Sequence, residues 1–189
     1  MVICEPAEQF ADNARSFARE SGKNKKIDVV SGFFEECTEK IKGIGVDFDL
    51  IILSSVLHEL DDPQKMLMAI RNLCSDRTVV HINVPNANSL HRLLAVKMGM
   101  IEDVHVQSQQ MKRMQRRRTY DMDLLIREVE ETGFVIEDRG SYFIKPFTHE
   151  QMQRCLDEGI INTQVLDGLE KLSDFLPDFG AGIYVNVVK

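Results

Sequence analysis

A carboxylate that could bind a ribose stands near the start of the chain. Glu5 directly follows the short apolar run 2–4, and Pro6 and a regularly patterned helix come next. In nucleotide-binding α/β sheets, an acid at the tip of a strand accepts hydrogen bonds from the ribose hydroxyl groups. A solvated acid at the end of an ordinary strand explains Glu5 as well.

A histidine that could act as a general base follows the most apolar segment, residues 48–53. The imidazole of His58, with an ordinary pKa near 6.5, could take a proton from a hydroxyl group near neutral pH. A histidine that only packs at a helix start is the alternative. Asp61 and Asp62 could suggest a metal pair, but a helix cap before Pro63 explains them better. Because no further acids or histidines stand at ligand spacing, we assign no metal.

Several polar side chains between residues 86 and 120 could hold an acidic or hydroxylated ligand. Arginine suits a carboxylate or phosphate because its planar fork of donors matches two oxygens. The candidates are His91, Arg92, Arg117, Arg118 and Tyr120. A solvated helix face is the simpler explanation of the basic run 112–118, which has no interleaved aromatic residues to stack on bases.

The segments that must position these residues alternate between strand and helix. Residues 48–53 form the strongest strand, since a nearly continuous apolar run is typical of a central parallel strand covered on both faces. Other strands are expected at 2–4, 27–30 and 78–84, and helices at 7–21, 35–41 and 62–73. Regular alternation of this kind predicts an α/β fold with a doubly wound, parallel sheet.

The second half of the chain is less regular. Residues 86–118 form a long connection with one helical piece near 90–98, and a connection of this length is usually functional. A helix from Asp121 to Gly133 follows. The last two strands are expected at 134–136 and 183–188, with helices near 150–158 and 163–172 between them.

Composition limits the partners and the compartment. The formal net charge of −7 argues against a general nucleic-acid binder, because neutralising phosphates needs a basic surface. No apolar run approaches the roughly 20 residues that a membrane helix needs, so no membrane partner is expected. The four cysteines contain no Cys-x-x-Cys pair, which favours reduced thiols in a cytoplasmic protein.

The order of the elements and the residues at the strand ends resemble class I S-adenosylmethionine-dependent methyltransferases, in particular the branch that acts on small molecules. The most specific match is the Leu-His-Glu-Leu-Asp-Asp-Pro sequence at 57–63, after an apolar strand. The other matching segments are 4–6, 31–35, 54–56 and 84–86, and the runs 89–94 and 117–120 look like enzymes related to quinone-ring methylation.

This resemblance implies a Rossmann-like, mostly parallel sheet with an antiparallel last strand. It also implies S-adenosylmethionine as the cofactor and methyl transfer to oxygen, nitrogen or carbon of a small-molecule acceptor. Residues 1–189 would form one domain, with residues 86–120 as its acceptor-binding insertion or lid. The implied cofactor-binding residues are Glu5, Pro6, Gly32, Phe33, Ser54, Ser55 and Val56, with His58 as the catalytic base and with His91, Arg92, Arg117, Arg118 and Tyr120 on the acceptor.

The chain departs from this family before Glu5, where the first strand and the glycine-rich cofactor loop would stand. In the family that strand lies between the second and the fourth, so we expect a gap in the sheet with an unpaired edge on each side. An omitted upstream segment, a partner segment or a homo-oligomer could complete the sheet. Alternatively, the chain is a non-catalytic module that has lost cofactor binding. A nicotinamide-dependent oxidoreductase is less well supported, because a Tyr-x-x-x-Lys pair is missing.

Overall fold

The structure is a computed structural model, which describes residues 1–22, 26–106 and 118–189. Its first half alternates strand and helix, as the sequence predicts. The elements are β1 (Val2–Glu5), α1 (Glu8–Glu20), β2 (Asp28–Ser31), α2 (Phe34–Lys42), β3 (Leu50–Ser54), the 3-10 turn η1 (Leu57–Glu59), α3 (Pro63–Arg71) and β4 (Val79–Pro85).

The second half contains the predicted helices and the last two strands. The strand expected at 134–136 extends much further than predicted, to Tyr142. The elements are α4 (Leu90–Lys97), α6 (Met122–Glu131), β5 (Val135–Tyr142), α7 (His149–Asp157), α8 (Thr163–Lys171), the 3-10 turn η2 (Leu172–Asp174) and β6 (Gly182–Val188).

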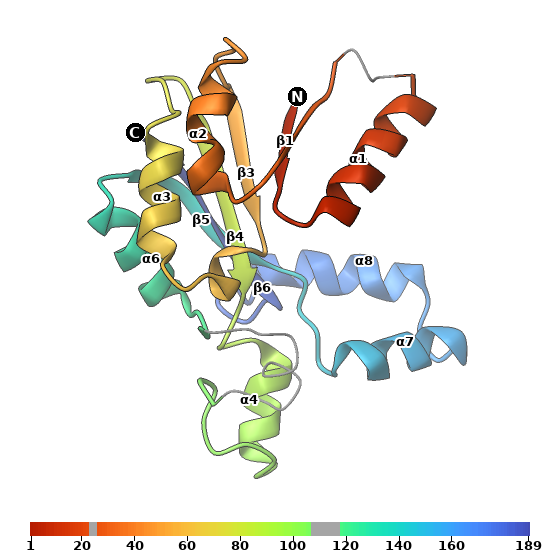
Figure 1. Cartoon of the computed structure of the whole chain (residues 1–189). Coiled ribbons are helices and arrows are strands. Elements are labelled where there is room, and N and C mark those ends of the chain that lie inside the picture. Colours follow the sequence, from red (N-terminus) through yellow and green to blue (C-terminus); the bar gives the residue numbers. More distant parts are fainter. Residues whose placement is uncertain (23–25, 107–117) are drawn as a thin grey trace.

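The strands form two separate sheets (Figure 1). One is the parallel pair β1–β2, and the other has four strands in the order β3-β4-β6-β5. β3 and β4 are parallel, whereas β6 runs antiparallel to both of its neighbours. The expected mostly parallel sheet with an antiparallel last strand is therefore present, and so is the expected interruption.

The interruption corrects one prediction. The apolar strand in residues 48–53 is not a central strand covered on both faces, because β3 pairs only with β4 among the described residues. Leu50 and Ile52, which point to the same face of β3, are 53% and 62% exposed. The prediction of a strand is confirmed. The prediction that both of its faces are buried is wrong for the described residues, because Leu50 and Ile52 are exposed.

The main core lies between the four-stranded sheet and the helices α3 and α6. Side chains at alternate positions of β4 and β6 meet the apolar faces of these two helices. The fully buried members of the main core include Tyr120, Leu57, Leu67, Ile70, Ile82, Leu125 and Ile183. A second, small cluster of Val30, Cys37 and Ile41 lies between β2 and α2. Phe34 packs against both clusters and so joins the two units.

Local capping explains where two of the core helices begin. The carboxylate of Asp62 accepts a hydrogen bond from Lys65 N at 3.1 Å, and Pro63 occupies the first turn of α3. Asp121 caps α6 in the same way through Leu124 N, at 2.8 Å. The helix-cap interpretation of Asp62 is therefore confirmed. Nowhere in residues 1–22, 26–106 and 118–189 is a helix both long and apolar enough to cross a membrane.

Candidate functional site

The carboxyl ends of the parallel strands lie at one edge of the molecule. Figure 1 shows β1, β3 and β4 running in the same direction, with their carboxyl ends toward the bottom of the view. Glu5 therefore ends β1 at the same edge at which Ser54 ends β3 and Pro85 ends β4. Ligands of open α/β sheets bind outside the carboxyl ends of the strands, so this edge is the candidate site.

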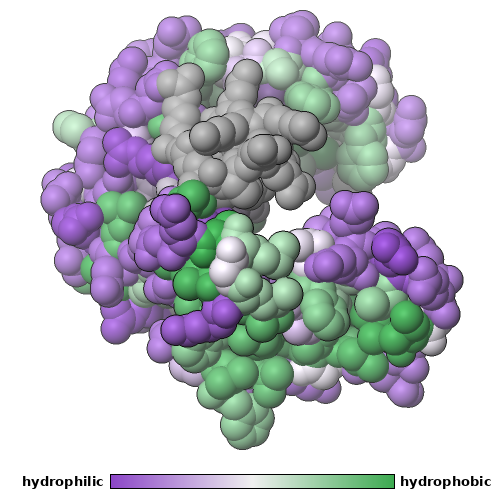
Figure 2. All heavy atoms as spheres, turned by 90° about the horizontal axis from the view of Figure 1, so that it is seen from below, coloured by the Kyte–Doolittle hydropathy of each residue, from purple (hydrophilic) through white to green (hydrophobic). Residues whose placement is uncertain are grey.

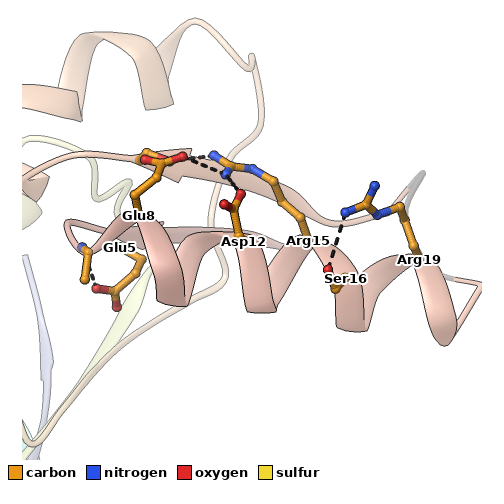
Figure 3. A network of polar contacts seen from close by, with 8 residues as sticks. Glu5, Glu8, Asp12, Arg15, Ser16 and Arg19 are labelled. Carbon is orange, nitrogen blue, oxygen red and sulfur yellow. Dashed lines mark hydrogen bonds and ion pairs between the residues drawn. The ribbon is translucent and has the colours of Figure 1, made fainter.

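Glu5 is held by the start of the helix that follows it. Its Oε1 accepts a hydrogen bond from Ala7 N at 2.9 Å, and the side chain points away from the ion pairs on α1 (Figure 3). The other carboxylate oxygen makes no hydrogen bond to the residues that the structure describes. It is thus available to accept hydrogen bonds from a ligand. Pro6, the next residue, is exposed.

An arginine network fixes α1 beside this strand end. Arg15 donates to Glu8 at 3.1 Å and to Asp12 at 2.7 Å (Figure 3). It also donates to Ser31 Oγ at the carboxyl end of β2. These contacts cross from the helix to the neighbouring strand. They therefore fix the small sheet on α1, although exposed ion pairs of this kind add little stability by themselves.

Gly32 sits in a tight turn directly after β2. Its φ is +133°, and its N donates to the carbonyl of Glu5 at 3.1 Å. A Cβ at this position would lie 2.8 Å from Cys37 Sγ, so both the backbone conformation and the space require glycine. Phe33, the next residue, is 62% exposed before the first turn of α2. Its ring is open to a ligand at this edge.

The turn after β3 is held by an asparagine on the neighbouring strand. Ser55 has a left-handed φ of +54°, and its N donates to the carbonyl of Asn83 at 2.9 Å. The hydroxyl groups of Ser54 and Ser55 each lie 3.3 Å from Asn83 Oδ1. Val56 is half-buried and packs on the main core. Both hydroxyl groups therefore stay at the strand end.

His58 is enclosed within the fold. His58 is the middle residue of η1 and is only 2% exposed. Its Nε2 lies 3.7 Å from Glu59 Oε1. Its carbonyl accepts a hydrogen bond from Arg118 N at 3.2 Å. A bound acceptor could reach the imidazole only if the surrounding side chains moved.

Two predicted acceptor residues share one buried carboxylate. Tyr120 is fully buried, and its hydroxyl group donates to Glu128 Oε2 at 2.5 Å, while Arg118 forms an ion pair with Oε1. Burial and the bond to Glu128 raise the pKa of Tyr120, so its hydroxyl group stays protonated. Sequence analysis missed Glu128, whose position on the core face of α6 was the available signal. Arg117 lies outside the described residues.

The other two predicted acceptor residues lie on α4. Arg92 donates to the carbonyl groups of Val104, through Nε at 3.0 Å, and Val106, at 2.9 Å. It therefore folds the segment after α4 back on the helix. Burial, then the charges of Lys145 and Arg92, lower the pKa of His91 to about 4. The imidazole of His91 is neutral at neutral pH.

A cavity of about 390 Å³ lies beside the connection between β4 and α6. Its polar lining includes Asn86 and Asn88 together with Asp121, Asp123 and Asp178. Although acids line part of this cavity, residues 1–22, 26–106 and 118–189 contain no group of three or more histidine, cysteine or acidic side chains that could hold a metal ion.

The face of the large sheet opposite α3 and α6 carries a polar network that sequence analysis also missed. Asn83 Nδ2 donates to His81 Nε2 at 3.2 Å, so His81 Nδ1 carries the hydrogen and donates to Asn186 Oδ1 at 2.8 Å. The His81 ring stacks on Tyr184, with centroids 5.6 Å apart. Polar residues at alternate positions of both strands were the signal in the sequence.

No curated protein matches the sequence at a significant level, and no protein-family model matches it. Solved structures match it along its whole length. A mitomycin 7-O-methyltransferase superposes with a TM-score of 0.55 and 12% identity over 100% of this chain and 41% of that chain. An S-adenosylmethionine-dependent methyltransferase from Mesorhizobium loti superposes with a TM-score of 0.57 and 12% identity. The match covers 100% of this chain and 80% of that chain.

A phosphoethanolamine N-methyltransferase from Haemonchus contortus, in complex with phosphomonomethylethanolamine and S-adenosylhomocysteine, gives a TM-score of 0.58 and 14% identity. The match covers 100% of this chain and 43% of that chain. The chain has the class I methyltransferase fold. It spans less than half the length of this enzyme and of the mitomycin enzyme. At sequence identities of 12–14%, the structural similarity shows the fold alone.

Proposed function

We propose that the protein transfers a methyl group from S-adenosylmethionine to a small-molecule acceptor. The observation that supports this most directly is the position of Glu5, Gly32 and Ser55 at the carboxyl edge of a methyltransferase fold. Among proteins with similar structures, one is named for methylation of oxygen and another for methylation of nitrogen. A further similar structure is named as a carbon methyltransferase, so the proposal covers methylation of oxygen, nitrogen or carbon.

The residues at this edge fit the cofactor. The second carboxylate oxygen of Glu5 would accept hydrogen bonds from the ribose hydroxyl groups. The exposed ring of Phe33 would lie along the adenine, and Gly32 would keep the turn narrow beside it. S-adenosylmethionine would supply an activated methyl group. Ser54, Ser55 and Val56 would border the cofactor on the side toward the acceptor.

Positioning would contribute more than acid–base chemistry. Methyl transfer is an in-line displacement that depends on alignment of the two reacting atoms, so a base is not essential. His58 remains the candidate base, although its burial means that it would act only after the side chains around it move. Residues 86–120 would form the acceptor side, where Arg92 holds the segment after α4 in place.

Full cofactor affinity would require a partner segment between the two sheets. The facing edges of β1 and β3 are not paired with each other, and Leu50 and Ile52 present apolar side chains to solvent. An extended segment parallel to both strands would satisfy their free backbone groups and cover these side chains. Figure 2 shows the molecule from below, with an opening on the side where α1, α7 and α8 lie in Figure 1.

Calorimetric titration with S-adenosylhomocysteine tests the cofactor site. The wild-type chain should bind, and Glu5→Gln should bind at least about tenfold more weakly, because hydrogen bonds to a charged carboxylate are worth about 1.5–3 kcal/mol. Glu8→Gln, which removes an exposed carboxylate paired with Arg15, should bind like the wild type. Equal affinity for the two variants would refute the assignment of Glu5.

A non-catalytic module is the second candidate function. The divided sheet and the exposed apolar side chains of β3 favour it. In that case a folded chain, verified by circular dichroism, should show no heat of binding with millimolar S-adenosylhomocysteine. Binding in the micromolar range would exclude this alternative.

A further inference from the structure

Three hydroxyl groups converge on one amide oxygen at the carboxyl ends of the strands. Asn83 Oδ1 lies 3.3 Å from Ser54 Oγ, 3.3 Å from Ser55 Oγ and 3.4 Å from the hydroxyl oxygen of Tyr142. Asn83 itself is only 7% exposed. The two serines belong to the end of β3 and the tyrosine ends β5, so one buried side chain links three strands.

The hydrogen-bonding capacity of this cluster is unbalanced. A carbonyl oxygen has two lone pairs and accepts about two hydrogen bonds, whereas each hydroxyl group brings one proton. At most two of the three hydroxyl groups can therefore donate to Asn83 Oδ1 at once. Ser54 Oγ also accepts a hydrogen bond from Asn83 Nδ2 at 3.1 Å, so the proton of Ser54 is the one left to bond elsewhere. Ser54 and Ser55 are exposed and Tyr142 is half-buried, so a ligand can reach the cluster.

The backbone is strained on both sides of the same cluster. Ser55 has φ +54° and Phe143, directly after Tyr142, has φ +60°; among the described residues these are the two non-glycine positions with positive φ. Each is held by a main-chain hydrogen bond, Ser55 N to Asn83 O at 2.9 Å and Ala181 N to Phe143 O at 2.8 Å. Strain of this kind persists where surrounding contacts fix it, and it gathers at functional sites.

A glycine makes room for the Tyr142 ring. Tyr142 and Gly182 are paired across β5 and β6, and a Cβ on Gly182 would lie 2.3 Å from Tyr142 Cζ and 2.4 Å from its hydroxyl oxygen. The ring therefore lies against bare backbone of β6. Any other residue at position 182 would move the hydroxyl group away from Asn83.

We propose that Tyr142 binds the hydroxyl or amine group of the methyl acceptor, and that Asn83 is the positioning residue that orients its phenol. This inference rests on the proposed methyltransferase function. The sheet order places β5 at the opposite end from β3, whereas the candidate cofactor residues Glu5 and Gly32 belong to the other sheet. Tyr142 thus approaches the shared serine turn from the side away from the cofactor residues.

The phenol would hold the acceptor without taking its proton. Burial, then the negative charge of Glu170, raises the pKa of Tyr142, so the hydroxyl group stays protonated near neutral pH. With its proton directed to Asn83 Oδ1, the phenol oxygen would accept a hydrogen bond from the acceptor O–H or N–H. The lone pair of the acceptor atom would then be free to point toward the methyl carbon.

Tyrosine-selective ¹³C labelling tests this assignment, because the chain contains only three tyrosines. The ring signals are assigned with Tyr120→Phe, Tyr142→Phe and Tyr184→Phe. Catechol and ethanolamine, as hydroxyl and amine probes, are titrated with and without S-adenosylhomocysteine. At least one probe should shift the Tyr142 signal with saturation, while the signals of Tyr120 and Tyr184 stay in place.

The outcomes separate this inference from the proposed function. If S-adenosylhomocysteine does not bind but a probe still shifts Tyr142 alone, the ligand site stands and the methyltransferase function fails. If S-adenosylhomocysteine binds and neither probe moves the Tyr142 signal, the function stands and this inference is overturned. Equal shifts of all three tyrosine signals would also overturn it.

Three variants test the geometry. Gly182→Ala should weaken the probe at least tenfold, although it keeps the hydroxyl group, because the added methyl displaces the ring. Gly168→Ala is the matched control, since a Cβ there meets nothing within 4 Å. Asn83→Leu should lose the response, whereas Asn83→Asp, which keeps an acceptor oxygen, should recover most of it. A full response in Asn83→Leu would contradict the positioning role.

Discussion

The two sheets of this molecule bury very different amounts of apolar surface. The larger unit, β3 to β6 with α3 and α6, surrounds a continuous core in which Ile70 and Leu125 are almost completely buried. The smaller unit, β1 and β2 with α1 and α2, buries the small cluster of Val30, Cys37 and Ile41 and the two alanines Ala11 and Ala18 of α1. Because burial is the main favourable term in folding, the smaller unit should open far more readily than the larger one.

The helices of the two units differ in the same way. α6 turns Leu125 and Val129 into the core, with no exposed surface on either. α1 instead packs through Ala11 and Ala18 and leaves Phe10 and Phe17 63% and 69% exposed. The large apolar side chains of α1 thus add nothing to the small core. The comparison shows that one sequence can specify two neighbouring sheets and yet stabilise them unequally.

A matched pair of isoleucines gives the largest expected effect. Ile70 on α3 and Ile41 on α2 are 1% and 2% exposed. Ile70→Ala should lower the free energy of unfolding of the larger unit by about 3–4 kcal/mol, as large core truncations do. Ile41→Ala should leave that value nearly unchanged and accelerate hydrogen exchange only in β1 and β2. A global loss of similar size in both variants would show that the units unfold together.

The buried carboxylate of the larger unit gives the next effect. Tyr120→Phe removes the hydroxyl group that donates to Glu128 and should cost about 2 kcal/mol, because a buried charge loses a donor. Chemical denaturation measures the loss. Tyr184→Phe removes a hydroxyl group that is not in the main core and should cost less than about 1 kcal/mol. Equal losses of stability in the two variants would mean that the hydrogen bond from Tyr120 to Glu128 adds no more stability than an ordinary hydroxyl contact.

Acid should weaken the larger unit through His91. Its pKa is about 4 in the folded protein and 6.5 as the ordinary value, so the unfolded chain binds more protons between these values. The stabilisation is complete above pH 6.5 and is lost as the pH falls toward 4, by at most about 3 kcal/mol, which solvent screening of this partly exposed side chain reduces. His91→Gln should lose less stability than the wild type over this range in denaturant titrations, whereas exposed His149→Gln should follow the wild type.

The smallest expected effect concerns the exposed face of α1. Phe17→Ser should change stability by less than about 0.5 kcal/mol, because the side chain is largely in solvent. Thermal unfolding at several protein concentrations provides the measurement. A loss above 1.5 kcal/mol that grows with concentration would mean that another molecule covers this face, and the smaller unit would then be more stable than its own core suggests.

Features fixed by neighbouring residues could be predicted from the sequence. The cap at Asp62 and the turn at Gly32 depend on residues a few positions away, and both stand where the pattern indicated. The apolar run of β3 predicted a strand that favours burial. The apolar run does not indicate which segment covers the strand, because the pairing partner of an edge strand depends on tertiary contacts.

Features that join distant segments could not be predicted in this way. Tyr142 lies beyond the strand expected at 134–136, and its bond to Asn83 joins residues 59 positions apart. The spacing of α6 places Glu128 on the same face as Leu125, but only the fold shows that it meets Tyr120. The candidate site is therefore partly visible in the sequence, at the strand ends, and partly a product of sheet pairing.

The thiol of Cys4 turns the unequal stability of the two units into a difference in chemical reactivity. Burial, then the neighbouring Cys37, raises the pKa of Cys4 to about 12, and the reactive thiolate is therefore scarce while β1 is packed. Opening of the small sheet would restore an ordinary thiol and speed alkylation. Cys74, in the main core, would wait for the larger unit to open. Mass spectrometry of a single alkylation time course would thus time both events separately.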